Sequence, residues 1–129
     1  MSRYDEVKEL AMAWNRAWNS RDPKELAAFF GPDSTYYEPD LNTGPVPGAQ
    51  GVVASAVNTW KDWPEAEFST VSLTIEASRV VLEWQSSATH RTGKVVQLEG
   101  VDILQWAGDK LVSARVYYDE HSRRKQLAD

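Results

Sequence analysis

Asp102 is the residue whose surroundings in the sequence point most clearly to chemistry. It lies in a stretch, 95–106, that alternates like a β-strand, and the other residues of its face are apolar or glycine: Val96, Leu98, Gly100, Leu104 and Trp106. Burial of an unpaired charge costs several kcal/mol, so we expect this carboxyl to take up a proton and donate a hydrogen bond. Such a carboxyl facing a cavity is a candidate for catalysis. The alternatives are pairing with an arginine or lysine of a covering helix, or an outward orientation after a register shift.

Glu38 is the second acid with a position suited to chemistry. It ends a short strand-like stretch and directly precedes Pro39. A carboxylate there could overhang the mouth of a pocket and act as a general base. A solvated glutamate at a strand end is the alternative.

Two further side chains bring polar groups to faces predicted to be apolar. Trp14 lies on the apolar face of the first helical segment, where it would pack in the core or donate its indole N–H to a ligand. His90 is inward by alternation but stands at a strand end beside Arg91, so it is either a pocket residue or a structural histidine.

The composition excludes several kinds of site. The chain has 129 residues and no cysteine, which rules out disulfides, thiolate metal sites and a cysteine nucleophile. Its two histidines are too few for a histidine-based metal site unless carboxylates complete it, and we expect no metal and no cofactor. Six tryptophans and five tyrosines suit a core, an interface or the wall of a pocket for a flat apolar ligand.

Charge and hydropathy argue against large polyanionic or lipid partners. The net charge is −5, and the cluster Arg123-Arg124-Lys125 is typical of a solvated helix end, so we expect no nucleic acid. No apolar run approaches the ~18 residues of a membrane span, and the N-terminus lacks the apolar core of a signal peptide. We therefore expect no membrane association and a cytoplasmic location.

The first half of the chain has helical periodicity. Apolar residues recur at helical spacing over 3–20: Val7, Leu10, Ala11, Trp14, Ala17 and Trp18. A short second helix is predicted from the N-cap Asp22 and Pro23, presenting Leu26, Phe29 and Phe30 and ending at Gly31-Pro32. A strand over 34–38, a loop over 40–50 and a third helix over 51–63 follow. That helix has Val53, Ala56, Val57 and Trp60 on one face.

The second half of the chain alternates as β-strands do. Four stretches, 68–77, 79–90, 95–106 and 111–119, are joined by short turns, which predicts an antiparallel meander. The inner residues of the second and fourth stretches are Val80, Leu82, Trp84, Ser86, Ala88 and His90, then Val112, Ala114, Val116 and Tyr118. The chain is thus predicted to be one α+β domain, 1–129, with a short strand, four long strands and three covering helices.

The outer face of the predicted sheet is not uniformly polar. Val81, Val101, Ile103 and Tyr117 lie there among charges and amides. They are either ordinary surface residues or a self-association surface, and we favour a homodimer through this face.

The chain resembles, nearly end to end, the nuclear transport factor 2-like superfamily, in particular its SnoaL-like and ketosteroid isomerase-like members. The resemblance rests on these segments in order: Ala13-Trp14-Asn15, Ala28-Phe29-Phe30, Thr35-Tyr36-Tyr37-Glu38-Pro39, Thr92-Gly93-Lys94, Gly100-Val101-Asp102, Tyr118-Asp119 and Gln126-Leu127. It implies a curved sheet and helices that form a cone around an apolar pocket. The pocket wall is then expected to include Trp14, Trp18, Tyr36, Trp60, Trp84, His90, Leu104, Val116 and Tyr118.

The resemblance also implies roles for the two acids. Glu38 occupies the position of the catalytic base of ketosteroid isomerases, and Asp102 that of the protonated aspartic acid of their oxyanion hole, a worked case of pKa tuning. Trp14 stands where those enzymes have a tyrosine. Val116 stands where SnoaL-like cyclases and limonene epoxide hydrolase have an aspartate, and the hydrolase's Arg-x-Asp pair falls near Trp84 and Ser86.

These observations predict binding of a small apolar molecule with cofactor-independent acid–base chemistry of the isomerase type. Glu38 would move the proton, and Asp102 would stabilise the oxyanion with help from Trp14. Two alternatives stay open. One is a binding domain for a ligand or partner without chemistry, and the other is a cyclase or dehydratase-type lyase that uses His90.

Overall fold

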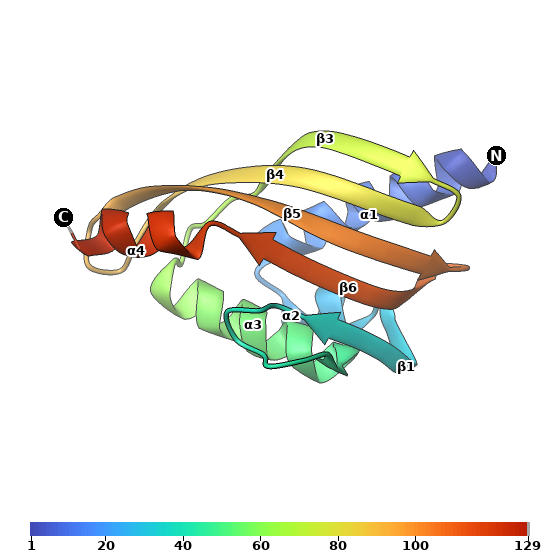
Figure 1. Cartoon of the computed structure of the whole chain (residues 1–129), viewed down its shortest axis with the longest axis horizontal. Helices are drawn as coiled ribbons and strands as arrows, with labels where there is room; N and C mark the ends of the chain where they lie inside the picture. Colours follow the sequence, from blue (N-terminus) through green and yellow to red (C-terminus); the bar gives the residue numbers. More distant parts are fainter. Residues whose placement is uncertain (129) are drawn as a thin grey trace.

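A computed structural model describes residues 1–128 as one curved sheet with helices packed against it (Figure 1). The helices are α1 (Arg3–Ser20), α2 (Pro23–Ala27), α3 (Gly48–Asp62) and α4 (Glu120–Ala128). The strands are β1 (Phe30–Tyr37), β2 (Val46–Pro47), β3 (Ser69–Glu76), β4 (Arg79–Thr89), β5 (Val95–Ala107) and β6 (Lys110–Tyr118). The α+β fold class and the cone-like architecture are confirmed, with one more helix and one more strand than predicted.

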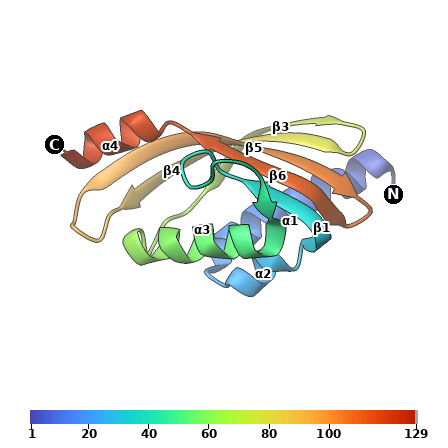
Figure 2. The ribbon, with the colours of Figure 1, turned by 60° about the horizontal axis from the view of Figure 1, so that its bottom comes forward.

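The sheet has the order β2-β1-β6-β5-β4-β3. The predicted meander β3–β6 is antiparallel throughout, and β1 adds to β6 in parallel. Figure 2 shows the sheet as a curved layer over α2 and α3, with α4 beyond the end of β6. No helix among residues 1–128 is long and apolar enough to cross a membrane.

The first two helices begin at capping signals that the sequence contains. Ser2 caps α1 by accepting a hydrogen bond from the Asp5 N–H, and Arg21 ends it in the left-handed conformation at φ 60°. Asp22 caps α2, with Pro23 at its first position. The apolar faces of α1 and α3 and the inner face of the sheet form one buried core.

Three predicted boundaries differ from the structure. The second helix ends at Ala27 instead of Gly31, because Phe30 already belongs to β1 and pairs with Leu111. The predicted loop contains β2, which pairs with Thr35 and Tyr36. The third helix begins at Gly48, and its buried residues are Gly48, Val52, Ser55 and Ala56.

Two predicted inner faces also need correction. Val57 of α3 is 53% exposed, because the buried face of this helix consists of Gly48, Val52, Ser55 and Ala56, and Val57 lies outside it. In β6, Val112 is 48% exposed and Leu111 is buried, because an irregularity in the β5–β6 register pairs Trp106 with Leu111 and Gln105 with Ser113. The extra residue of this β-bulge reverses the alternation at one end of the strand.

Candidate functional site

A pocket of about 740 Å³, its open mouth included, lies between the inner face of the sheet, α1, α3 and α4. The pocket deepens along the paired strands β4 and β5, from one inward-facing residue pair to the next. Ala88 pairs with Val96, Ser86 with Leu98, Trp84 with Gly100 and Leu82 with Asp102. Successive inward pairs are about 7 Å apart. Leu82 and the next inward residue, Leu104, are closed off in the core, so Asp102 lies at the floor.

Asp102 accepts a hydrogen bond from an indole at each of its oxygens. Trp14 Nε1 donates to Oδ2 and Trp84 Nε1 to Oδ1, both at 2.9 Å. The carboxyl is 5% exposed and lines the pocket. Burial raises its pKa from 3.8 to about 6, the two indole donors oppose this rise, and the charge of Glu38 adds to it. Both oxygens of Asp102 act as hydrogen-bond acceptors in this structure, and donors of this kind favour the carboxylate. The protonated form that the sequence led us to expect stays a prediction.

Gly100 allows the indole of Trp84 to reach Asp102. The two residues are directly opposite in the β4–β5 pair, and the ring lies over the glycine. A Cβ at position 100 would stand 2.1 Å from Trp84 Cζ2, closer than atoms can approach. The missing side chain is what gives the indole its place beside the carboxylate.

Glu38 is also buried, and three hydroxyl groups bind it. Tyr36 (2.7 Å) and Ser55 (2.6 Å) donate to Oε1, and Tyr118 (2.5 Å) donates to Oε2. The backbone N–H of Glu38 donates to Asn42 Oδ1, which fixes the turn after β1. Burial and the nearby Glu38 carboxylate raise the pKa of Tyr36 and that of Tyr118, so both phenols stay protonated.

The small residues of α3 explain how Ser55 reaches Glu38. A Cβ at Gly48 would collide with the Phe30 ring, and a Cβ at Gly51 would come within 3.1 Å of Tyr36. The helix therefore lies against β1 at close range, and Ser55, one turn after Gly51, meets the end of that strand. Sequence reasoning missed Ser55, although the spacing of Gly48, Gly51 and Ser55 indicates a small-residue face.

Helix α4 lies at the mouth of the pocket. Arg123 lines it, with its guanidinium 5.4 Å from the Tyr118 ring centroid and ion pairs to Glu120 (2.6 Å) and Asp40 (3.4 Å). Gln126 joins α4 to β5 through both backbone groups of Gln97. Arg123 was expected at a solvated helix end. Its partner Asp40 belongs to the loop after β1, and nothing in the sequence around either residue predicts that the two meet.

The structure brings six of the predicted site residues to the pocket wall: Trp18, Glu38, Trp84, Asp102, Val116 and Tyr118. Trp14 and Tyr36 are fully buried behind the carboxylates that they bind, and Leu104 lies in the core. Trp60 packs edge to face against Trp18 outside the wall.

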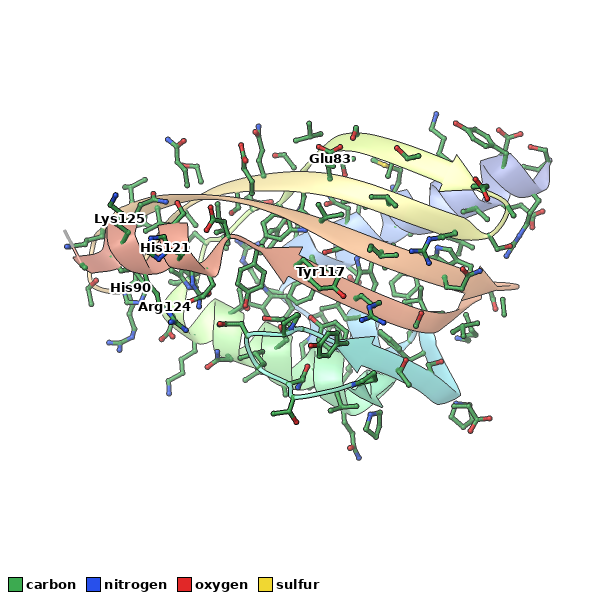
Figure 3. The ribbon with its side chains drawn as sticks, viewed as in Figure 1. Glu83, His90, Tyr117, His121, Arg124 and Lys125 are labelled. Atoms are coloured by element: carbon green, nitrogen blue, oxygen red, sulfur yellow. The ribbon has the colours of Figure 1, made fainter. Side chains whose placement is uncertain are left out.

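His90 is also outside the wall. Its Nδ1 is 2.8 Å from Thr92 Oγ1, and its ring packs edge to face against Trp63. In Figure 3, the His90 label lies near α4, toward the C-terminal end of the molecule.

The remaining wall residues were not predicted as site residues. Polar ones are Asn15, Ser55, Thr59, Ser86 and Arg123, and apolar ones are Trp63, Ala66, Phe68, Ala88, Val96 and Leu98. Alternation already turned Ser86, Ala88, Val96 and Leu98 inward, so their inclusion follows from the pattern once the depth of the pocket is known. Within residues 1–128, no cluster of three or more histidine or acidic side chains could hold a metal ion.

Comparison with known proteins agrees with this architecture. Residues 11–114 match the family model of the SnoaL-like domain. No curated protein shows significant similarity to the chain.

Solved structures share the fold at low sequence identity. A candidate polyketide cyclase from Xanthomonas campestris pv. campestris aligns with a TM-score of 0.85 and 17% identity, over 98% of this chain and 99% of that one. AclR, a candidate hydroxylase from Streptomyces galilaeus, aligns with a TM-score of 0.84 and 24% identity, over 96% and 85%. A ketosteroid isomerase-like protein from Catenulispora acidiphila, solved with trimethylamine, aligns with a TM-score of 0.81 and 19% identity, over 93% and 92%.

Proposed function

The chain belongs to the SnoaL-like family, and from that premise we propose that it binds a small, largely apolar carbonyl compound and moves a proton on it without a cofactor. The observation that carries the proposal is the Asp102 carboxylate at the floor of an apolar pocket, held by two indole N–H groups. A carboxylate whose pKa is about 6 is a better base than an exposed one and is still ionised at neutral pH. The proposal therefore gives the role of base to Asp102.

The proposed reaction moves one proton between the ligand and Asp102 and needs no other reactant. Asp102 takes the proton from the carbon next to the carbonyl, and the C–H electrons move to the carbonyl oxygen as an enolate. Tyr118, whose strand position pairs with Gly100 one step from Asp102, offers its hydroxyl to that oxygen. The proton returns from Asp102 to the same or a conjugated carbon, which gives exchange or isomerisation.

Glu38 completes the arrangement by holding Tyr118. Its Oε2 accepts the Tyr118 hydroxyl, and Tyr36 and Ser55 fix the other oxygen. The hydroxyl of Tyr118 can turn from Glu38 to the substrate oxygen as charge develops there. Glu38 is then the residue that positions the donor, and Tyr118 keeps its proton throughout.

A ligand-binding domain without chemistry is the second candidate. It is favoured by one observation: protein donors already occupy both oxygens of Asp102 and both of Glu38. Carboxylates so completely bound also serve as purely structural groups. The two candidates differ in what happens to a bound carbonyl compound.

The test is hydrogen–deuterium exchange of cyclohexenones and 1,3-diketones in D₂O, followed by proton NMR, with binding measured in parallel by tryptophan fluorescence. We expect the protein to accelerate exchange, Asp102→Asn to slow it about 100-fold, and Glu38→Gln to slow it less, with circular dichroism unchanged. Exchange at the buffer rate for compounds that do bind would establish the binding domain instead. Acceleration that survives both substitutions would overturn the roles given to the two acids.

A further inference from the structure

The floor of the pocket holds two carboxylates that are solvated only by neutral groups. Asp102 is bound by two indoles and Glu38 by three hydroxyls. Among the described residues that line the pocket, Arg123 is the cationic one, and it is paired with Glu120 and Asp40 at the mouth. Neutral donors lower the cost of burying these charges but do not cancel them.

This charge distribution selects among ligands. Two uncompensated carboxylates in a low-dielectric pocket produce a negative potential that disfavours anions and favours a cation. A positive group on the ligand would supply the counter-charge that the protein does not place at the floor.

The wall beside the floor is built of adjoining aromatic rings. Trp18 meets Phe68 at 5.8 Å, Phe68 meets Trp84 at 5.3 Å and Trp84 meets Tyr118 at 6.3 Å between ring centroids. All four side chains line the pocket, and they come from α1, the segment before β3, β4 and β6. Ring faces attract organic cations, and aromatic rings beside a carboxylate are a common way of binding alkylated ammonium groups.

We propose that the ligand of this pocket carries a protonated or quaternary amine, placed among these rings with its charge toward Asp102 and Glu38. Its apolar remainder would lie toward the mouth, where Trp63, Ala66 and Val96 form a second apolar cluster. The inference rests on the pocket of the proposed function but not on its proton-transfer step. Where that step does occur, Asp102 becomes neutral as it takes the proton, and the ammonium charge would offset the enolate that forms near the Glu38 carboxylate.

The experiment compares three compounds of similar shape: phenyltrimethylammonium, its neutral isostere tert-butylbenzene, and the anion 4-tert-butylbenzoate. Affinities are measured at pH 7.5 by quenching of tryptophan fluorescence and by calorimetry. We expect the cation to bind at least tenfold more tightly than the neutral compound, and the anion to bind most weakly. Equal affinities, or tighter binding of the neutral compound or the anion, would overturn the inference.

Substitutions test which residues cause the preference for a cation. Asp102→Asn should weaken the cation at least tenfold and leave the neutral compound within about twofold. Glu38→Gln should weaken the cation selectively as well. Glu83→Gln removes the same charge from an exposed position of β4 and serves as the matched control (Figure 3). A control that weakens the cation as much as Asp102→Asn does would show that only the overall charge of the protein matters, which would refute a site in the pocket.

The wild-type protein provides a test that needs no variant. The titratable or charged groups that face Asp102 in the pocket are Glu38 and Tyr36 from β1 and its end, Tyr118 from β6 and Arg123 from α4. Phenyltrimethylammonium does not titrate, so its affinity should rise between pH 5 and 7.5, by about tenfold if only ionised Asp102 binds it. An affinity that is constant or falls over this range would overturn the inference, whatever the exchange experiment shows about catalysis.

Discussion

Asp102 and its two indole donors come from three parts of the chain. The sequence predicted the orientation of each one separately, because helical spacing turned Trp14 inward and strand alternation turned Trp84 and Asp102 to the same face. It could not predict that the donors would be indoles instead of an arginine or lysine, because that depends on how α1 crosses the sheet. The expected proton on Asp102 follows from burial alone, and the indole N–H groups act against it.

The same carboxyl predicts how stability changes with pH. The pKa of Asp102 is higher in the folded protein than its ordinary value of 3.8, so between 3.8 and about 6 the folded state binds more protons than the unfolded state. The free energy of unfolding therefore falls as pH rises through this window, the opposite of the usual behaviour of a salt-bridged aspartate. The loss should reach about 1–3 kcal/mol by pH 7.

Urea unfolding of the wild type and of Asp102→Asn at several pH values from 4 to 7.5 measures this effect. The stability of the wild type relative to the variant should decrease as pH rises, because the variant has no carboxyl at this position. The same comparison with Glu83→Gln, which changes an exposed carboxylate of β4, is the control. A constant difference for Asp102→Asn would mean that burial does not perturb this group.

At the scale of elements, the four long strands and the two longest helices were predictable because their periodicity is sustained over many residues. The errors in side-chain orientation fall in one strand and one helix. The bulge in β6 reverses the positions of Leu111 and Val112, and nothing local in the sequence signals it. In α3 the apolar residues predicted that one face would be buried. The face that packs closely on β1 is the neighbouring one, which contains Gly48, Gly51 and Ser55.

The bulge gives a direct mutational prediction. Leu111 is 2% exposed, and Leu111→Ala should lower the free energy of unfolding by about 2–5 kcal/mol through the cavity it leaves. Val112 is 48% exposed, and Val112→Thr should change it by less than about 0.5 kcal/mol. Chemical denaturation checks both. Simple alternation predicts the reverse order, so a large effect at Val112 with a small one at Leu111 would contradict the register described above.

At the scale of the whole molecule, the pocket lies on the inner side of the sheet, and the outer side faces away from it. This outer face carries Val101, Ile103 and Tyr117, and the Arg115 guanidinium lies 5.1 Å from the ring centroid of Tyr37 and 6.0 Å from that of Tyr117. We proposed from the sequence that a second copy covers this face. A dimer formed in this way would leave the mouth of the pocket, on the helix side, accessible in both copies.

Sedimentation velocity at micromolar concentration should therefore give the mass of a dimer. Ile103→Lys, which places a charge on the outer face of β5, should shift the protein toward the monomer because a charge at the centre of an interface is costly to bury. Ligand binding in the pocket should persist. A monomeric wild type, or a dimer that tolerates this substitution, would exclude the outer face as the interface.

The arrangement of the pocket along one hairpin has a consequence for evolution. The floor is fixed by Asp102 and Trp84, while the wall nearer the mouth comes from Ser86, Ala88 and Leu98 of the same two strands. Substitutions near the mouth can enlarge, shorten or reshape the space for the apolar part of a ligand without moving the carboxylate or its indole donors. Descendants of this chain could thus acquire new ligands step by step while they inherit the reactive group unchanged.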